Sequence, residues 1–337
     1  MDNLKNLIEA VSVSGAEFYS EKVISRLFFK SGAEVCCDKL SNVIARKNEK
    51  GKIKVLLDAH FDTIGLMVTK IEEGGFLRFV TVGGVDLRIL PSLTVTVHGK
   101  ENITGVIGVK PPHLLKGNEN KAYKKEELFI DTGKSEQELK DIVSVGDVVT
   151  FKGELTGLLN GRIASPGLDD KLGVYMVSEV LNKVTNENIC LYGVATVGEE
   201  IGLKGAKVIG NYDEFDLCIA IDVTHGMTPD AIKNRAFELG KGPVITMGPS
   251  LSKEYNDKIK DFAKKNNISL QVEVEPGNTG TNAWAYHSAK ASNPSVMISI
   301  PLRYMHTAYE VADIKDINDG ITLISGFLNS MEVEDNA

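Results

Sequence analysis

The sequence lacks an excess of positive charge, long apolar runs and paired cysteines. Its 38 Lys and Arg residues are outnumbered by 46 Asp and Glu residues, which gives a net charge of −8. A surface that binds nucleic acid needs cations to contact phosphates, so this balance argues against nucleic acid as a partner. No apolar stretch approaches the ~18 residues that indicate a transmembrane helix. We therefore expect neither nucleic acid nor a membrane as a partner.

The four cysteines also lack the spacing of a zinc site. Cys36 and Cys37 are adjacent, Cys190 and Cys218 are isolated, and no Cys-x-x-Cys pair occurs. The first residues show no basic start followed by an apolar stretch, as a signal peptide would. These absences predict free thiols in a reducing compartment, and we expect a cytoplasmic protein.

The chain has 337 residues. Outside its middle part, apolar segments with a strand-like pattern alternate with segments that have helical periodicity. Strands are predicted at residues 53–59, 189–197, 217–222, 269–274 and 296–300. Helices are predicted between and after them at 172–184, 205–209, 252–265, 283–289 and 314–331. Such alternation predicts an α/β domain with a mostly parallel sheet and helices on both faces. The length of the whole chain suggests about two domains.

The middle of the chain has a different pattern. Short strand-like runs separated by glycine turns occur at 76–82, 93–97, 104–109 and 147–152, which predicts a small β-rich barrel or sandwich. Ser135 to Glu138 form a capping box that starts a short helix. Residues 116–127 are polar and lysine-rich, so we expect an exposed loop. The expected organisation is a discontinuous catalytic domain, 1–70 and 155–337, with an inserted domain, 71–154.

Polar groups that could bind a metal follow several predicted strands. Each has a plain structural explanation when taken alone, such as a surface pair, a helix cap or a solvated loop. Ligands bind at the carboxyl ends of the strands in open α/β sheets, so these groups should converge. Two histidines and several carboxylates there suit one or two divalent ions such as zinc, cobalt or manganese. The combination favours a metallohydrolase, and its members are His60, Asp62, Asp169, Asp170, Glu199, Glu200, Asp222 and His306.

Five motifs occur in an order that resembles a known family. They are His60-Phe61-Asp62-Thr63-Ile64-Gly65, Gly167-Leu168-Asp169-Asp170-Lys171, the segment 197–206, Ile221-Asp222-Val223-Thr224-His225 and Arg303-Tyr304-Met305-His306. Together they resemble the tetrahedral (TET-type) aminopeptidases, also called glutamyl aminopeptidases and in part labelled endoglucanases. The resemblance extends through the insert at 105–113 and covers essentially the whole chain.

The resemblance implies a dinuclear metal site. Asp169 would bridge two ions, zinc or cobalt by expectation, with manganese as a further possibility. His60 and Asp222 would complete one site, and Glu200 and His306 the other. It also implies a cis peptide bond after Asp169.

The resemblance further implies the catalytic groups. Glu199 would be the general base that activates water, and Asp62 would hold His60 in one orientation. The family usually has Gly-Gly-Thr-Asp-Ala near the substrate pocket, where this chain has Thr279-Gly280-Thr281-Asn282-Ala283. Gly280 and Asn282 are therefore tentative substrate-binding residues, and the preferred N-terminal residue stays open.

The favoured function is a metal-dependent aminopeptidase acting on small peptides. An endoglucanase would need paired acids and no metal, so the histidines argue against it. A non-catalytic homologue, and a related metal-dependent deacylase or carboxypeptidase, also fit parts of the pattern. The resemblance also implies homo-oligomers, in which the insert forms dimers and six dimers build a twelve-subunit tetrahedron (a dodecamer).

Overall fold

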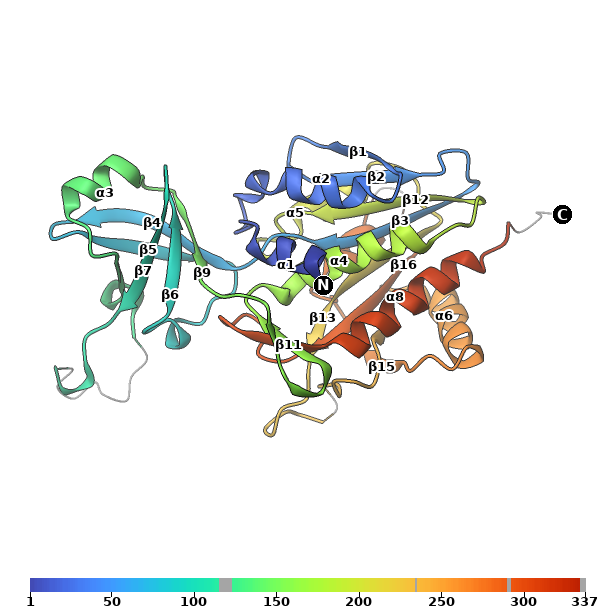
Figure 1. The fold of residues 1–337 in the computed structure, drawn as a ribbon. Coiled ribbons are helices and arrows are strands. Elements are labelled where there is room, and N and C mark those ends of the chain that lie inside the picture. The colour runs from blue at the N-terminus through green and yellow to red at the C-terminus, as the bar shows by residue number, and fades with distance from the viewer. Residues whose placement is uncertain (115–122, 234, 290–291, 334–337) are drawn as a thin grey trace.

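The protein is built of a sheet-centred part and a separate barrel (Figure 1). The computed structural model describes residues 1–114, 123–233, 235–289 and 292–333. The expected loop at 116–127 lies largely outside these residues. No helix among the described residues is long and apolar enough to cross a lipid bilayer.

The main sheet has eight strands, and the four at its centre are parallel. The outer pairs β1–β2, β2–β12 and β14–β16 are antiparallel. The central strands are continuous apolar runs because both faces of the sheet are covered. In spatial order the strands are β1 (Glu34–Cys37), β2 (Val43–Lys47), β12 (Ile189–Thr196), β3 (Ile53–His60), β13 (Leu217–His225), β16 (Ser295–Leu302), β14 (Val244–Met247) and β15 (Gln271–Val274).

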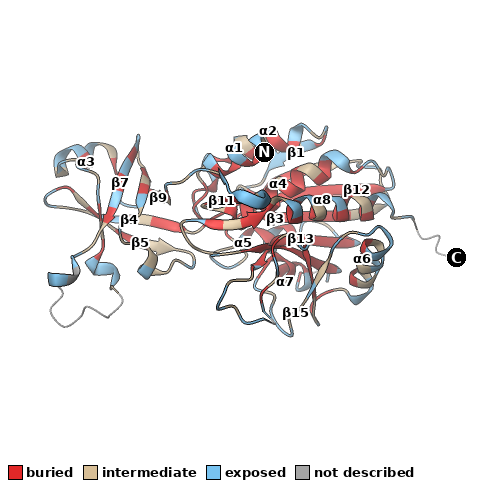
Figure 2. Cartoon of the chain, turned by 60° about the horizontal axis from the view of Figure 1, so that its bottom comes forward, coloured by how far each residue is buried: buried red, intermediate tan, exposed pale blue. Residues whose placement is uncertain are grey.

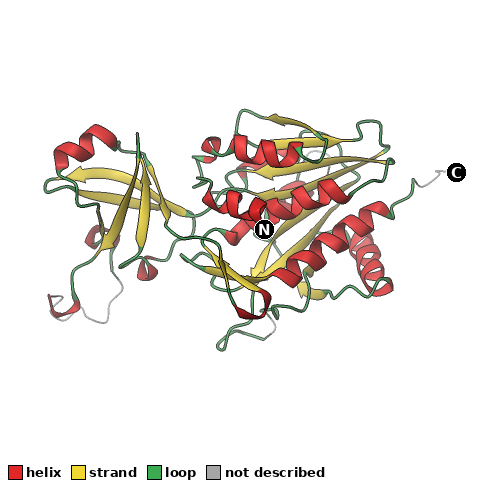
Figure 3. Ribbon diagram, in the orientation of Figure 1, coloured by secondary structure: helices red, strands yellow, loops and turns green. Residues whose placement is uncertain are grey.

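Helices cover both faces of the sheet, each face with its own apolar cluster (Figures 2 and 3). Helix α4 packs against β3, β12 and β13 on one face, and α7 packs against β13 and β16 on the other. The first face carries α1 (Asp2–Glu9), α2 (Glu21–Phe29), α4 (Leu168–Lys183), α6 (Lys253–Lys265) and α8 (Ile314–Asn329), and the second carries α5 (Lys204–Ile209) and α7 (Asn282–His287). The expected α/β class with helices on both faces is confirmed.

The β-rich middle of the chain closes into a six-stranded barrel at one end of the molecule (Figure 1). Its apolar interior includes Leu66, Val97 and Ile130, all buried. The helix α3 (Glu136–Ile142) starts at Ser135, whose capping box is present as predicted. The barrel strands begin at Gly65, a few residues before the boundary expected at 71. They are β4 (Gly65–Glu72), β5 (Phe76–Val82), β8 (Phe129–Asp131), β7 (Asn102–Gly108), β6 (Thr94–His98) and β9 (Val148–Phe151).

A small third sheet joins two distant loops. It contains β10 (Thr156–Gly157), β11 (Arg162–Ser165) and β17 (Glu310–Asp313). Ser165 pairs with Glu310 in the β11–β17 register. The chain that leads into α4 therefore lies beside the loop that follows β16.

Candidate metal centre

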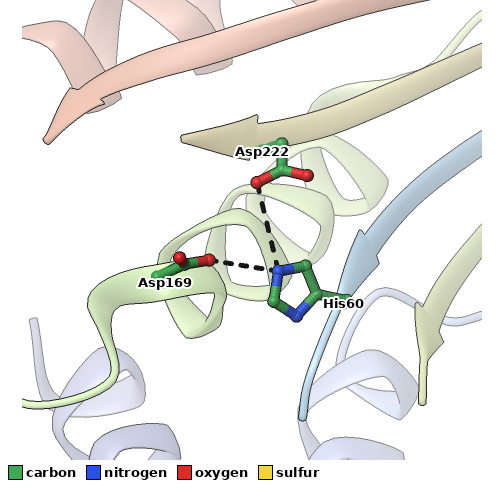
Figure 4. Close-up of side chains that lie close together, drawn as sticks. All are labelled: His60, Asp169 and Asp222. Carbon is green, nitrogen blue, oxygen red and sulfur yellow. Dashed lines mark hydrogen bonds and ion pairs between the residues drawn. The ribbon is translucent and has the colours of Figure 1, made fainter. Parts of the chain in front are cut away.

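Three side chains that could bind a metal, each from a separate element, meet at the carboxyl edge of the main sheet (Figure 4). His60 ends β3, Asp222 lies near the end of β13, and Asp169 lies in the first turn of α4. The His60 Nε2 atom is 3.1 Å from Asp169 Oδ1 and 4.0 Å from Asp222 Oδ1. The peptide bond between Asp169 and Asp170 is cis.

A second group shares Asp169 with the first. The other oxygen of Asp169, Oδ2, is 3.4 Å from His306 Nε2, which in turn is 3.1 Å from Glu200 Oε1. Potential ligand atoms of Asp169, Glu200 and His306 lie within 4.8 Å of one another. The β11–β17 pairing explains this meeting, since Asp169 follows β11 and His306 precedes β17. Asp169 thus faces each group with a different oxygen atom.

The surroundings of these groups favour a bound cation. Burial and, to a smaller extent, the nearby Asp169 carboxyl raise the pKa of Asp222 to about 7, although His60 acts in the opposite direction. Hydrogen bonds that His306 donates to the carboxylates of Asp169 and Glu200 raise the pKa of its imidazole to about 11. Burial alone would raise the pKa of Asp169, but hydrogen bonds from His306 and His60 outweigh it and lower that pKa. These carboxylates favour protonated imidazoles beside them, because positive charge is stabilised there. Divalent cations could supply this positive charge in place of the protons.

The orientation of His60 leaves one ring nitrogen free for a cation. Its Nδ1 lies 2.9 Å from the backbone carbonyl of Asp62, and a carbonyl can only accept a hydrogen bond. Nδ1 therefore carries a proton, and Nε2, which faces Asp169 and Asp222, is the nitrogen whose lone pair would bind a cation in place of its own proton. Such an outer hydrogen bond fixes the tautomer of a metal-binding histidine.

The carboxylate of Asp62 has a different set of contacts. It is 3.6 Å from His60 Nδ1, but it accepts hydrogen bonds from the backbone amides of Glu199 and Glu200 at 2.9 and 3.1 Å. It also accepts one from the Ser14 hydroxyl at 2.7 Å. Asp62 therefore touches His60 mainly through its backbone, while its side chain fixes the loop that carries the two glutamates.

Glu199 lies beside the metal-binding groups with a carboxyl group suited to hold a proton. Burial, together with the nearby charges of Asp222, Glu200 and Asp62, raises its pKa to about 8, although the charge of His60 acts in the opposite direction. A carboxyl group whose pKa is near neutral can both take and return a proton.

Glu310 supports the centre and was missed by sequence reasoning. It is a buried residue whose Oε2 accepts from the Asp169 amide at 3.1 Å and whose Oε1 accepts from the His306 amide at 3.0 Å. One carboxylate thus links the backbones of two candidate ligands. Its position four residues after His306 carries no pattern that singles it out.

Two further supports come from loops distant in the sequence. A Cβ atom at Gly84 would lie 2.7 Å from His306 Nδ1, so this loop after β5 approaches the centre closely. Glu17 accepts hydrogen bonds from the amides of Gly15 at 2.7 Å and Gly198 at 3.1 Å, and thereby holds the segment before Glu199. In the sequence, only the adjacent glycines Gly83 and Gly84 indicate that a backbone segment could pass close to other groups.

A cavity of about 660 Å³ adjoins the metal centre. Gly280 is part of its lining, together with Glu199 and all five candidate ligands. Asn282 is buried next to it, and its Nδ2 donates to Asp58 Oδ2 and Thr196 Oγ1, both at 2.8 Å. The amide nitrogen of Asn282 is therefore held by protein groups.

Comparisons with known proteins show to which family the chain belongs. The family described as M42 glutamyl aminopeptidase matches residues 41–323. A lysyl aminopeptidase of Pyrococcus furiosus is 35% identical over 339 residues, covering 98% of this chain and 97% of its own.

Two solved structures show the same fold. An aminopeptidase from the archaeon Desulfurococcus kamchatkensis has a TM-score of 0.91 at 32% identity, covering 98% of this chain and 94% of its own. A TET1 peptidase of Pyrococcus horikoshii, which can assemble into a tetrahedron or a large octahedral shell, has a TM-score of 0.86 at 31% identity, covering 98% and 99%. The chain therefore belongs to the M42 glutamyl aminopeptidase family and is a hydrolase that acts on peptide bonds.

Proposed function

We propose that this protein is a dinuclear metalloaminopeptidase that removes N-terminal residues from small peptides. The observation that carries the proposal is the position of Asp169, whose two carboxylate oxygens face two separate groups of ligands. His60 and Asp222 would complete one ion site, and Glu200 and His306 the other. Zinc or cobalt suits these nitrogen and oxygen donors, and manganese is a further possibility.

Bound divalent cations would supply Lewis acidity, which polarises the scissile carbonyl and makes a water more acidic. Residues of the chain itself transfer the protons and hold the reacting groups in position. Glu199 takes a proton from the attacking water, so that the oxygen can add to the carbonyl carbon. It then returns this proton to the leaving nitrogen as the C–N bond breaks. Asp62 keeps Glu199 in place through the hydrogen bond to its backbone amide.

The excess of acidic groups supports a substrate with a free amine. The cavity beside the centre contains Glu199, Glu273 and Glu275, none of which is a candidate metal ligand. Opposite charges attract and like charges repel, so a protonated α-amine is favoured here and a C-terminal carboxylate is disfavoured. This argues for an aminopeptidase over a carboxypeptidase or a deacylase of blocked substrates.

A glycosidase and a non-catalytic homologue receive less support. A glycosidase would use two carboxylates that flank a sugar. That mechanism does not require the two imidazoles that lie beside Asp169. A non-catalytic homologue would need neither Glu199 nor the buried support that Glu310 gives to two ligand backbones.

We propose different roles for the two tentative substrate-binding residues. Gly280 has a positive φ of 71° and open space around its Cα, so it can border the substrate without a side chain. Asn282 acts at a distance from the substrate, because its amide joins Asp58 on β3 to Thr196 on β12. It would support the strand ends that carry His60 and the Glu199 loop.

For the whole assembly we propose dimers formed through the barrel, six of which make a hollow shell of twelve subunits. The TET1 peptidase that this chain resembles can form a tetrahedron. Isologous dimers fit such closed symmetry.

The function is tested by a panel of substrates after chelation and metal addition. Free-amine aminoacyl anilides should be cleaved with added zinc, cobalt or manganese, and chelated protein should be inactive. N-acetylated anilides, C-terminally free blocked peptides and cellulose derivatives are the comparison substrates. Cleavage of any of these in preference to free-amine anilides would contradict the proposal.

A further inference from the structure

The cavity beside the metal centre extends away from the candidate ligands towards one edge of the main sheet. That end is formed by β13, β14 and β15 and by the segment before α7. Its lining there includes Thr224, Thr246, Glu273, Glu275, Thr281 and Trp284.

The carboxylate of Glu273 is fixed at this end of the cavity. Its Oε1 accepts from the Thr224 hydroxyl at 3.1 Å, and its Oε2 accepts from the Thr246 hydroxyl at 2.9 Å. Both threonines are buried, whereas Glu273 is half-buried. A carboxylate has about four lone-pair sites, so two fixed hydrogen bonds leave capacity for a further donor.

The charges around Glu273 are mostly negative. Glu275 is two residues further along the chain and also lines the cavity, as expected from the alternation of side chains in a strand. The lysine in the lining, Lys207, donates to the backbone carbonyl of Gly202 at 2.9 Å. His225 is also in the lining and is exposed. Among the described residues in the lining, no cation forms a hydrogen bond or ion pair with Glu273.

We propose that this cavity receives the side chain of the substrate's N-terminal residue, and that Glu273 selects a cationic side chain, lysine or arginine. This inference rests on the aminopeptidase function proposed above, and it adds the class of substrate. The ammonium or guanidinium group donates to the free lone pairs of Glu273.

The spacing along β13 fits the length of such a side chain. Asp222, a candidate ligand, and Thr224, a partner of Glu273, are two residues apart on the same side of the strand, which places them about 7 Å apart. A lysine side chain spans about 6 Å from Cα to Nζ when extended. Trp284 and Met297 in the lining offer apolar contact for its aliphatic stem.

The decisive comparison uses lysyl and norleucyl anilides, since norleucine keeps the four-carbon chain and lacks the ammonium group. A hydrogen bond to a charged group contributes enough to change kcat/KM by about 10- to 100-fold. We expect wild-type kcat/KM to favour the lysyl over the norleucyl anilide by that factor. Glutamyl anilide should be cleaved more slowly than glutaminyl anilide because its carboxylate meets Glu273 and Glu275.

The variant Glu273→Gln keeps the shape of the side chain and removes its charge. It should bring the lysyl-to-norleucyl ratio close to 1, mainly through loss on the lysyl anilide, while norleucyl cleavage stays within about threefold of wild type. Glu238→Gln is the matched control. Glu238 is exposed, and its backbone amide donates to the side chain of Gln271, which lies on β15 as Glu273 does. This control should leave the ratio unchanged. Thr246→Val removes one of the two hydroxyl groups that donate to Glu273. It should lower the lysyl-to-norleucyl ratio to a value between those of wild type and Glu273→Gln.

Several outcomes would overturn the inference. A wild-type ratio near 1 would do so without any variant, as would an unchanged ratio in folded Glu273→Gln protein. An equal loss on all substrates in Glu273→Gln would assign Glu273 to the α-amine instead. In each case cleavage of free-amine anilides would leave the aminopeptidase function standing. Failure to cleave any of them would overturn both.

Discussion

Glu199 and the five candidate ligands share one acidic pocket, but their carboxyl groups have different neighbours. Each of the ligand carboxylates Asp169 and Glu200 lies within 3.4 Å of an imidazole nitrogen. Glu199 is fixed through its backbone amide by Asp62, and its carboxyl group is left for chemistry. The residue should therefore be dispensable for metal binding and necessary for turnover.

The first prediction follows from this difference. Glu199→Gln should lower kcat by roughly 10²- to 10⁴-fold, the usual contribution of a general base. The metal content of the purified variant should stay near that of wild type. Wild-type rates in a fully metallated variant would refute the assignment.

Asn282 provides a second prediction at this scale. Asn282→Asp would place a second carboxylate 2.8 Å from Asp58, whose own pKa burial raises to about 6. Two buried carboxylates repel each other unless one carries a proton. Their pKa values in the folded state therefore exceed the unfolded value of ~3.9, so the variant should lose stability as the pH rises through about 6.

Thermal unfolding of wild type and Asn282→Asp at pH 5 and pH 8 measures this effect. The difference in Tm should be larger at pH 8. The ratios of kcat/KM on glutamyl, leucyl and lysyl anilides should stay the same as in wild type at pH values where both proteins are folded. A shift in these ratios would instead place residue 282 against the substrate side chain.

At the scale of elements, the sequence predicted what apolar patterns encode. The central strands and most helices are recognisable because continuous apolar runs and helical periodicity reflect burial. His60, Asp222 and Glu199 could be picked out because each lies at or just after the end of such a strand. β11, β14 and β17, of four residues each, were not predicted. β9 has the same length, and it was recognised because it follows a series of short strand-like runs separated by glycine turns.

The supports of the centre escaped prediction for a different reason. Glu310, Glu17 and Gly84 act through contacts made only when distant loops meet. Nothing local in the sequence distinguishes Glu310 from a solvated glutamate. The structure adds these residues because the β11–β17 pairing and the loop after β5 place them there.

The loop after β5 gives a prediction at this scale. Gly84→Ala would put a methyl group 2.7 Å from His306 Nδ1, so the imidazole must move. We expect the affinity of one metal site to fall about tenfold or more, with little change in global stability, because a displaced ligand loses its geometry. Gly157→Ala is the control, since a Cβ there meets no atom within 4 Å. Equal metal affinity in both variants, measured by equilibrium dialysis, would contradict this role of Gly84.

At the scale of the whole molecule, the strands of the barrel carry none of the candidate ligands, although the loop after β5 reaches His306. The barrel forms a closed structure with its own apolar core, at one end of the molecule (Figure 1). A separate module of this kind suits contacts between subunits. The cytoplasmic location and the absence of nucleic-acid partners stay predictions from composition.

The assembly is accessible to light scattering. The metallated protein should have the mass of twelve chains of 36.6 kDa each. A stable dimer in the presence of metal would count against the shell alone. A stable monomer would count against the barrel as an interface as well.

The central claim is that two cations share Asp169 and serve the removal of N-terminal residues. Its most direct test is a titration of chelator-treated protein with cobalt or zinc, in which bound metal and hydrolysis of a free-amine aminoacyl anilide are measured together. We expect saturation at two equivalents per chain, with full activity reached only when both are bound. Saturation at zero or one equivalent, or full activity without bound metal, would contradict the claim.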